Sequence, residues 1–147
     1  MERNTGMKDR AEKTILVIED EPDVTIYLST ILHDNGYKVE TAGNGIEAMN
    51  KIRTAKPDLI SLDISLPAKT GVNIYCELKE DPLFSSIPVI IVSGIERDFK
   101  SFIHSRKDIP PPDGFISKPF IINELLNMIA NILTGKPVEQ VPGDNHR

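Results

Sequence analysis

Apolar runs of four or five residues alternate along this chain with longer segments whose apolar residues recur at helical spacing. The runs TILVI and VIIV are continuous and rich in β-branched residues, as is typical of strands buried on both faces of a sheet. Five segments are predicted to be strands: Thr14–Ile18, Lys38–Ala42, Asp58–Leu62, Val89–Val92 and Gly114–Ser117. Strands that alternate with helices predict an α/β fold, in which helices cover both faces of a parallel sheet.

The segments between these strands carry the signals of helices. Pro22 suits the first turn of a helix, and Asn35–Gly36 suits its end. In the next helix, Ile46, Met49 and Ile52 form the predicted buried stripe. The remaining predicted helices are Val72–Glu80, Glu96–Lys107 and Phe120–Leu133. Of these, Glu96–Lys107 has the least regular apolar spacing.

The length of the chain, 147 residues, fits one compact domain with its own core. The patterned part is residues 13–134, which we interpret as that domain. Residues 1–12 are charged and almost without apolar side chains, and they are predicted to be a mobile leader. Residues 135–147 contain two prolines and no periodicity, and they are predicted to be a disordered tail.

The composition excludes several kinds of protein. Cys76 is the single cysteine, which excludes an internal disulfide framework and a cysteine-rich zinc site. No apolar stretch approaches the ~20 residues of a membrane span, and the N-terminal segment lacks the apolar core of a signal peptide. The sequence therefore predicts a cytoplasmic protein without membrane contact. A net charge of −5 argues against direct binding to nucleic acid.

Polar and charged residues stand where the apolar runs stop. They are Glu19, Asp20 and Glu21 after the first run, Asp63 after the third, Ser93 after the fourth and Lys118 after the fifth. The carboxyl ends of parallel strands meet at one edge of the sheet, where ligands bind in folds of this kind. Clustered carboxylates repel one another and need a positive partner, for which Lys118 and Mg²⁺ are the candidates. A carboxylate in such surroundings could be a ligand, a base or a nucleophile that forms an aspartyl phosphate.

Four segments of the chain resemble motifs of the receiver domain of bacterial two-component response regulators. They are ILVIEDEPDV at Ile15–Val24, PDLISLDISLPAKTG at Pro57–Gly71, VIIVSG at Val89–Gly94 and GFISKPF at Gly114–Phe120. Each motif is short, but the four occur in order at plausible spacing, and the resemblance covers residues 13–134. It implies a flavodoxin-like fold, with a doubly wound five-stranded sheet of order 2-1-3-4-5 and five flanking helices.

The resemblance implies a Mg²⁺-dependent phosphoacceptor site. Asp63 matches the aspartate that accepts the phosphoryl group, and it also binds the metal. Asp20 matches the main metal-binding acid, and Glu19 matches the acid beside it, which usually reaches the metal through water. The third protein ligand would be the backbone carbonyl of Ser65. Glu19 is one methylene longer than the more usual aspartate, so the metal distance or affinity could differ.

The resemblance also assigns the groups that hold the phosphoryl group and pass on the signal. Ser93 matches the hydroxyl residue that closes on the phosphoryl group. Lys118, followed by Pro119 as in the family, matches the lysine that pairs with the phosphoryl oxygens. Ser93 and Phe115 together match the switch pair of the family. Because Phe115 lacks the hydroxyl of the commoner tyrosine, its part in a switch would rest on packing alone.

The implied function is that of a signalling domain and not of an enzyme. A sensor histidine kinase or a phosphotransfer protein would phosphorylate Asp63, and the face of helix four, strand five and helix five would change shape for an unknown effector protein. The chain would be either a stand-alone regulator or a receiver excised from a longer one. In either case, no direct contact with nucleic acid is expected.

Three alternatives stay open at this point. A flavodoxin-like enzyme or cofactor carrier would need a phosphate-cradling loop after the first strand, but the acids of EDEPD at Glu19–Asp23 would repel a phosphate. An aspartate-based phosphatase would have a second aspartate two residues after Asp20, where this chain has Pro22. The third is a degenerate receiver that acts only as a protein-interaction module.

Overall fold

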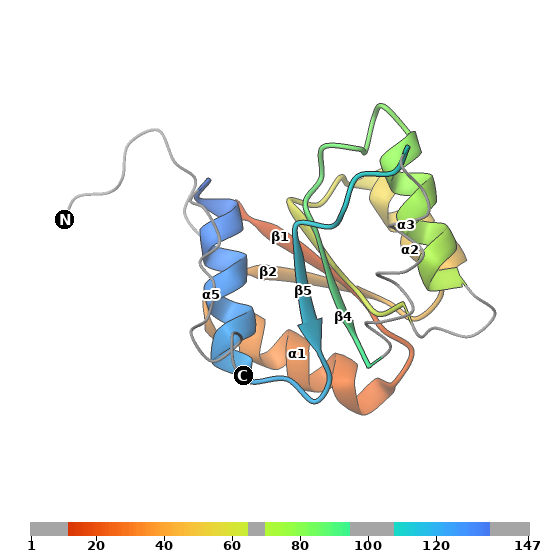
Figure 1. Cartoon of the computed structure of the whole chain (residues 1–147). Helices are drawn as coiled ribbons and strands as arrows, with labels where there is room; N and C mark the ends of the chain where they lie inside the picture. The colour runs from red at the N-terminus through yellow and green to blue at the C-terminus, as the bar shows by residue number, and fades with distance from the viewer. Residues whose placement is uncertain (1–11, 65–69, 95–107, 136–147) are drawn as a thin grey trace.

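The chain folds around one five-stranded sheet (Figure 1), and the computed structural model describes residues 12–64, 70–94 and 108–135. Every pair of neighbouring strands is parallel, and the order across the sheet is β2-β1-β3-β4-β5. The strands are β1 Thr14–Ile18, β2 Lys38–Ala42, β3 Leu59–Leu62, β4 Val89–Ser93 and β5 Gly114–Ser117. The predicted α/β class and the flavodoxin-like strand order are both confirmed.

Helices of the described residues cover both faces of this sheet (Figure 1). On one face lie α1, Pro22–Asp34, and α5, Ile122–Leu133. On the other face lie α2, Gly45–Thr54, and α3, Thr70–Glu80. The helix predicted over Glu96–Lys107 lies outside the described residues.

The sheet divides the hydrophobic core into two halves. Along β1, Leu16 and Ile18 belong to the half that includes the buried residues of α2 and α3. Ile15 and Val17 belong to the half beneath α1 and α5. Successive side chains of a strand point to opposite faces, and helices cover both faces here. That is why the run TILVI is apolar at every position.

The prediction is wrong for one residue of α2. Ile46 was expected in the buried stripe of α2 together with Met49 and Ile52, but its side chain is 79% exposed. The residues of α2 that are buried are Ala48, Met49 and Ile52. At about 100° per residue, Ile46 lies roughly 120° around the helix from Ile52, on the solvent side of the buried face. Apolar character alone therefore placed Ile46 wrongly.

The boundaries of the first and last helices follow from local signals. Pro22 occupies the first turn of α1, and the chain leaves the helix through Asn35 and Gly36, whose φ of 97° suits glycine. The last helix begins at Ile122, two residues later than the predicted start at Phe120. Phe120 instead belongs to the loop that joins β5 to α5. In the described part of the chain, no helix has both the length and the apolar character needed to cross a membrane.

Candidate functional site

The register of the sheet brings the residues that follow three strands to one edge. Backbone pairing continues one residue past β1, where the Glu19 amide donates to the Ala42 carbonyl at 3.0 Å. The Asp63 amide likewise donates to the Ile18 carbonyl at 3.1 Å, and the Lys118 amide to the Ser93 carbonyl at 3.1 Å. The backbone positions of Glu19, Asp63 and Lys118 are therefore fixed by the sheet and not by a free loop.

Three carboxylates meet at this edge. Ligand oxygens of Glu19, Asp20 and Asp63 all lie within 4.8 Å of one another. Glu19 and Asp63 are buried, with exposed fractions of 3% and 2%, whereas Asp20 faces solvent. Burial, and then the nearby charge of Asp63, raise the pKa of Glu19 from 4.5 to about 7. The cluster is thus electrostatically unfavourable without a positive partner.

The ammonium of Lys118 supplies one positive charge to the cluster. Its Nζ lies 3.1 Å from Oε1 of Glu19 and 3.2 Å from Oδ2 of Asp63. A weaker contact, at 3.9 Å, joins it to Oε1 of Glu21. Burial acts to lower the pKa of Lys118, but the hydrogen bond to Glu19 and the charge of Asp63 outweigh that effect and raise the pKa. One ammonium therefore compensates only part of the acidic charge.

The donor set fits a hard divalent cation. All three side chains offer carboxylate oxygens, which Mg²⁺ prefers, and the exposed Asp20 leaves one side of the cluster open to water. Mg²⁺ commonly takes one or two protein carboxylates and keeps several waters. Glu19, Asp20 and Asp63 could therefore hold the ion together. Ser65, the predicted source of a backbone ligand, lies outside the described residues.

The predicted switch residues occupy the two strands next to the acidic cluster. Ser93 ends β4 and is completely buried, and its register partner is Ser117 of β5. Phe115 pairs in register with Ile91 and packs, partly buried, against the half of the core that includes α3. Ser93 is thus next to the backbone of Lys118, and Phe115 lies earlier on the same strand as that lysine.

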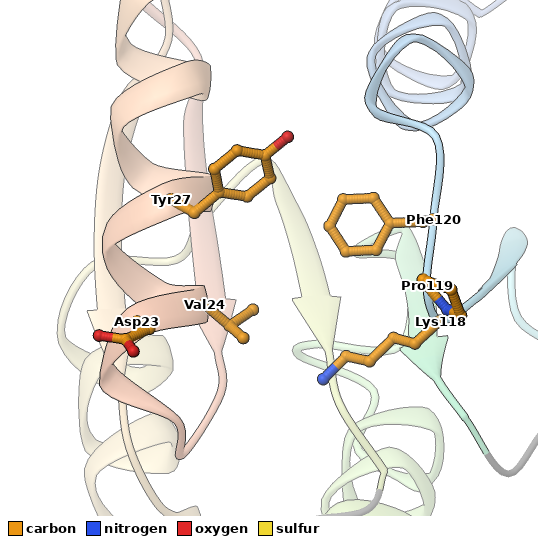
Figure 2. Close-up of a pocket in the computed structure, with 6 residues that line it drawn as sticks. All are labelled: Asp23, Val24, Tyr27, Lys118, Pro119 and Phe120. Carbon is orange, nitrogen blue, oxygen red and sulfur yellow. The ribbon is translucent and has the colours of Figure 1, made fainter.

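A pocket of about 520 Å³ opens beside Lys118, between α1 and the loop that follows β5 (Figure 2). Val24 and Tyr27 of α1 face Phe120 across it, and the rings of Tyr27 and Phe120 are 6.4 Å apart between centroids. Pro119, which follows a cis peptide bond, completes the apolar lining, and Asp23 lies at the rim. The long side chain of Lys118 runs along the pocket, so the opening is next to the acidic cluster.

The fold and this edge of the sheet define the class of protein. A doubly wound parallel sheet with acids and a lysine at the carboxyl ends of its strands is a flavodoxin-like domain, and its acidic edge suits a cation. A model of the response regulator receiver domain matches residues 15–130, and the chain belongs to that family.

Known proteins of the family are similar over most of this chain. KdpE of Staphylococcus aureus, a transcriptional regulatory protein, is 35% identical over 114 residues, which are 78% of this chain and 47% of KdpE. A signal receiver domain of a histidine kinase from Syntrophus aciditrophicus is 31% identical and covers 88% of this chain and 96% of its own, with a TM-score of 0.74. TrrA of Thermotoga maritima, solved with Mg²⁺ and BeF, is 28% identical and covers 82% of this chain and 98% of its own, with a TM-score of 0.70.

The chain spans about half the length of several curated relatives, KdpE among them. The similarity to these relatives is therefore limited to the part of each that matches this chain. The relatives are proteins of different overall type, among them a response regulator of Synechocystis and a hybrid signal transduction histidine kinase of Dictyostelium discoideum.

Most of the site residues predicted from the sequence do lie together. Ion pairs or short distances join Glu19, Asp20, Asp63 and Lys118 at one edge of the sheet. Glu21, which was predicted to follow the first strand but was given no role, also reaches Lys118. Sequence reasoning missed the aromatic pair of Tyr27 and Phe120. The available signal for Tyr27 was an aromatic side chain outside the apolar positions predicted for that helix. In the structure Tyr27 is 49% exposed and pairs with Phe120.

Proposed function

We propose that this chain is a phosphorylation-activated receiver whose acceptor is Asp63. The observation that carries the proposal is the contact of Lys118 Nζ with Asp63 Oδ2 at 3.2 Å inside a cluster of three carboxylates. A buried aspartate that is held by both a cation site and an ammonium has the surroundings that phosphoryl transfer requires. Membership of the receiver family supports the same role.

The reaction we propose is transfer of a phosphoryl group from a phosphohistidine. A carboxylate oxygen of Asp63 forms a bond to phosphorus while the N–P bond to the donor histidine breaks, and the electron pair of that bond stays with the imidazole. Bound Mg²⁺ would neutralise part of the charge on the phosphoryl oxygens. Lys118 would pair with one of these oxygens, and the Ser93 hydroxyl would donate a hydrogen bond to another.

We propose that the donor protein docks on the pocket beside Lys118. A phosphohistidine must come within bonding distance of Asp63, so the donor surface must lie on the elements around this edge of the sheet. Tyr27 is exposed there, and Val24 and Phe120 are partly buried beside it and next to Lys118. A helical donor face with apolar residues around its histidine would fit this lining. The partner is accordingly a sensor histidine kinase or a phosphotransfer protein.

The signal would leave through a neighbouring surface. When Ser93 moves toward the phosphoryl group, the space it leaves would be filled by Phe115, and the face formed by β5, α5 and the helix predicted at Glu96–Lys107 would change. The output of this chain is therefore proposed to be contact with an effector protein in the cytoplasm. We propose neither a metabolic reaction nor direct contact with nucleic acid.

The test of the proposed function is labelling with acetyl phosphate. Incubation with acetyl phosphate and millimolar Mg²⁺ should add the mass of one phosphoryl group to the intact protein, and EDTA should prevent the addition. Asp58→Asn is a matched control, because Asp58 lies at the opposite end of β3 and accepts from the Thr14 amide. It should be labelled like the wild type. Failure of the wild type to be labelled would favour a receiver that acts only as an interaction module.

A further inference from the structure

Gly71, in the first turn of α3, lies against the backbone that follows Asp63. A Cβ atom built on Gly71 would be 2.3 Å from Cα of Ile64 and 2.8 Å from its carbonyl carbon and oxygen. All three atoms belong to the main chain, so no side-chain rotation can relieve the overlap. The hydrogen of Gly71 therefore allows an approach between helix and loop that no other residue type permits.

Ile64 is bonded directly to Asp63, and its side chain is buried. Its side chain is 3% exposed and packs in the same half of the core as Ile74 of α3. On the other side of the acceptor, the Asp63 amide is hydrogen-bonded to the Ile18 carbonyl. The position of Asp63 therefore depends on two contacts. Its amide is hydrogen-bonded to the sheet, and Ile64, the residue that follows it, lies against Gly71.

The helix that carries Gly71 has little freedom to retreat. Tyr75 and Leu78 of α3 are completely buried, and the hydroxyl of Tyr75 donates to the Pro110 carbonyl at 2.5 Å. Ordinary contacts of a Cβ atom begin at 3.4 Å, so a methyl group at position 71 would require a shift of about 1 Å. Among the described residues, backbone pairing of β3 with its neighbours ends at Asp63. The main chain at Ile64 is therefore the part that would shift, and Asp63 would shift with it.

We propose that Gly71 is a positioning residue for Asp63 and that its lack of a side chain sets the distance of the acceptor carboxylate from Glu19, Asp20 and Lys118. This inference rests on the proposed phosphoacceptor function. A displacement of about 1 Å at a reacting group can cost on the order of 10²-fold in rate. A loss of that size would exceed what a small change in folding stability produces in a protein that remains folded.

The experiment compares three substitutions to alanine at glycines. At Gly43 a Cβ atom would have neighbours only at 3.9 Å, so Gly43→Ala is the control for a tolerated methyl group near Glu19. At Gly114 a Cβ atom would lie 2.3 Å from Sδ of Met128, at the opposite end of β5 from the site. Gly114→Ala is therefore the control for an overlap with a flexible side chain, which can move away, at a distance from the acceptor.

Mg²⁺ affinity by titration calorimetry and the rate of labelling by acetyl phosphate are measured well below each melting temperature. We expect Gly71→Ala to bind Mg²⁺ at least about tenfold more weakly and to be labelled on the order of 10²-fold more slowly. Gly43→Ala and Gly114→Ala should match the wild type in both. A folded Gly71→Ala protein with unchanged affinity and rate would overturn the inference.

The remaining outcomes also decide the question. If Gly71→Ala does not fold at any temperature, Gly71 serves the fold as a whole and the positioning role is overturned. If the wild type itself neither binds Mg²⁺ nor becomes labelled, the proposed function fails, whatever the variants do. The positioning role is supported if Gly71→Ala loses both labelling and Mg²⁺ affinity while the two control variants keep both.

Discussion

The ammonium of Lys118 lies 3.2 Å from Oδ2 of Asp63 and thereby links the end of β5 to the end of β3, two strands that are separated in the sheet by β4. The same ammonium reaches Glu19 at the end of β1. A phosphoryl group on Asp63 would add negative charge at the point where these strands meet. Lys118 is therefore the side chain through which a change at Asp63 reaches β5 most directly.

We predict that Lys118→Ala separates phosphorylation from signalling. Mg²⁺ bound by the carboxylates would still neutralise charge at the acceptor, so acetyl phosphate should label the variant, about tenfold more slowly than the wild type. Without the lysine, β5 loses its contact with the phosphoryl group. Amide exchange between Ser93 and Phe120 should then no longer respond to beryllofluoride, although it responds in the wild type.

The exposed residue Lys56 provides the control for removal of a lysine charge. Lys56→Ala should be labelled and should respond to beryllofluoride like the wild type. If Lys118→Ala retains both the wild-type labelling rate and the exchange response, Lys118 is only a structural counter-ion for the acids.

We predict that Asp63→Asn melts at a higher temperature than the wild type when metal is absent. The charge of Asp63 contributes to the raised pKa of Glu19, and repulsion between two carboxylates at this range is on the order of 1–3 kcal/mol, which Asn removes. Lys118 keeps Glu19 as a partner at 3.1 Å, so the substitution does not leave it unpaired. The melting temperature in EDTA should therefore rise by a few degrees.

The same variant should gain less from Mg²⁺, because it has lost one carboxylate of the site and a ligand stabilises only in proportion to its binding of the native state. Thermal melting of both proteins in EDTA and in millimolar Mg²⁺ measures the two effects together. A clearly lower melting temperature of Asp63→Asn in EDTA would mean that Asp63 holds the fold together, and that the acidic cluster has been misread.

We predict that Tyr27→Ala distinguishes protein donors from small donors. Labelling by acetyl phosphate should be unchanged, because Tyr27 is not among the charged groups around Asp63. Labelling by a phosphorylated phosphotransfer protein that is active on the wild type should fall about tenfold, equivalent to about 1.4 kcal/mol of docking energy. Ile46→Ala is the matched control, since Ile46 is exposed and lies on α2, which covers the opposite face of the sheet (Figure 1). An equal loss in both variants would place docking elsewhere.

Much of this arrangement could be predicted from the sequence because it depends on backbone rules. The run TILVI indicates a strand covered on both faces, and parallel strands bring their carboxyl ends to one edge. Those two rules are enough to place Glu19, Asp63 and Lys118 together without knowledge of any contact. The motif order then indicated the family, which the match over residues 15–130 confirms.

The remaining features depend on packing that periodicity does not encode. Ile46 is apolar but lies on the wrong side of α2, because the orientation of that helix is set by Ala48 and Ile52. The pocket between Tyr27 and Phe120 depends on how the loop after β5 approaches α1. The close contact of Gly71 with Ile64 joins two residues whose distance no sequence pattern reports.

Mapping of the phosphorylated residue tests the central claim most directly. The wild-type protein is labelled with acetyl phosphate and Mg²⁺ and then reduced with borohydride, which converts an aspartyl phosphate to homoserine. Peptide mass spectrometry locates the homoserine. We predict that it occurs at position 63 and that omission of Mg²⁺ or the Asp63→Asn substitution abolishes it. Homoserine at Asp20 instead, or labelling of the Asp63→Asn protein at any position, would contradict the assignment of Asp63 as the phosphoacceptor.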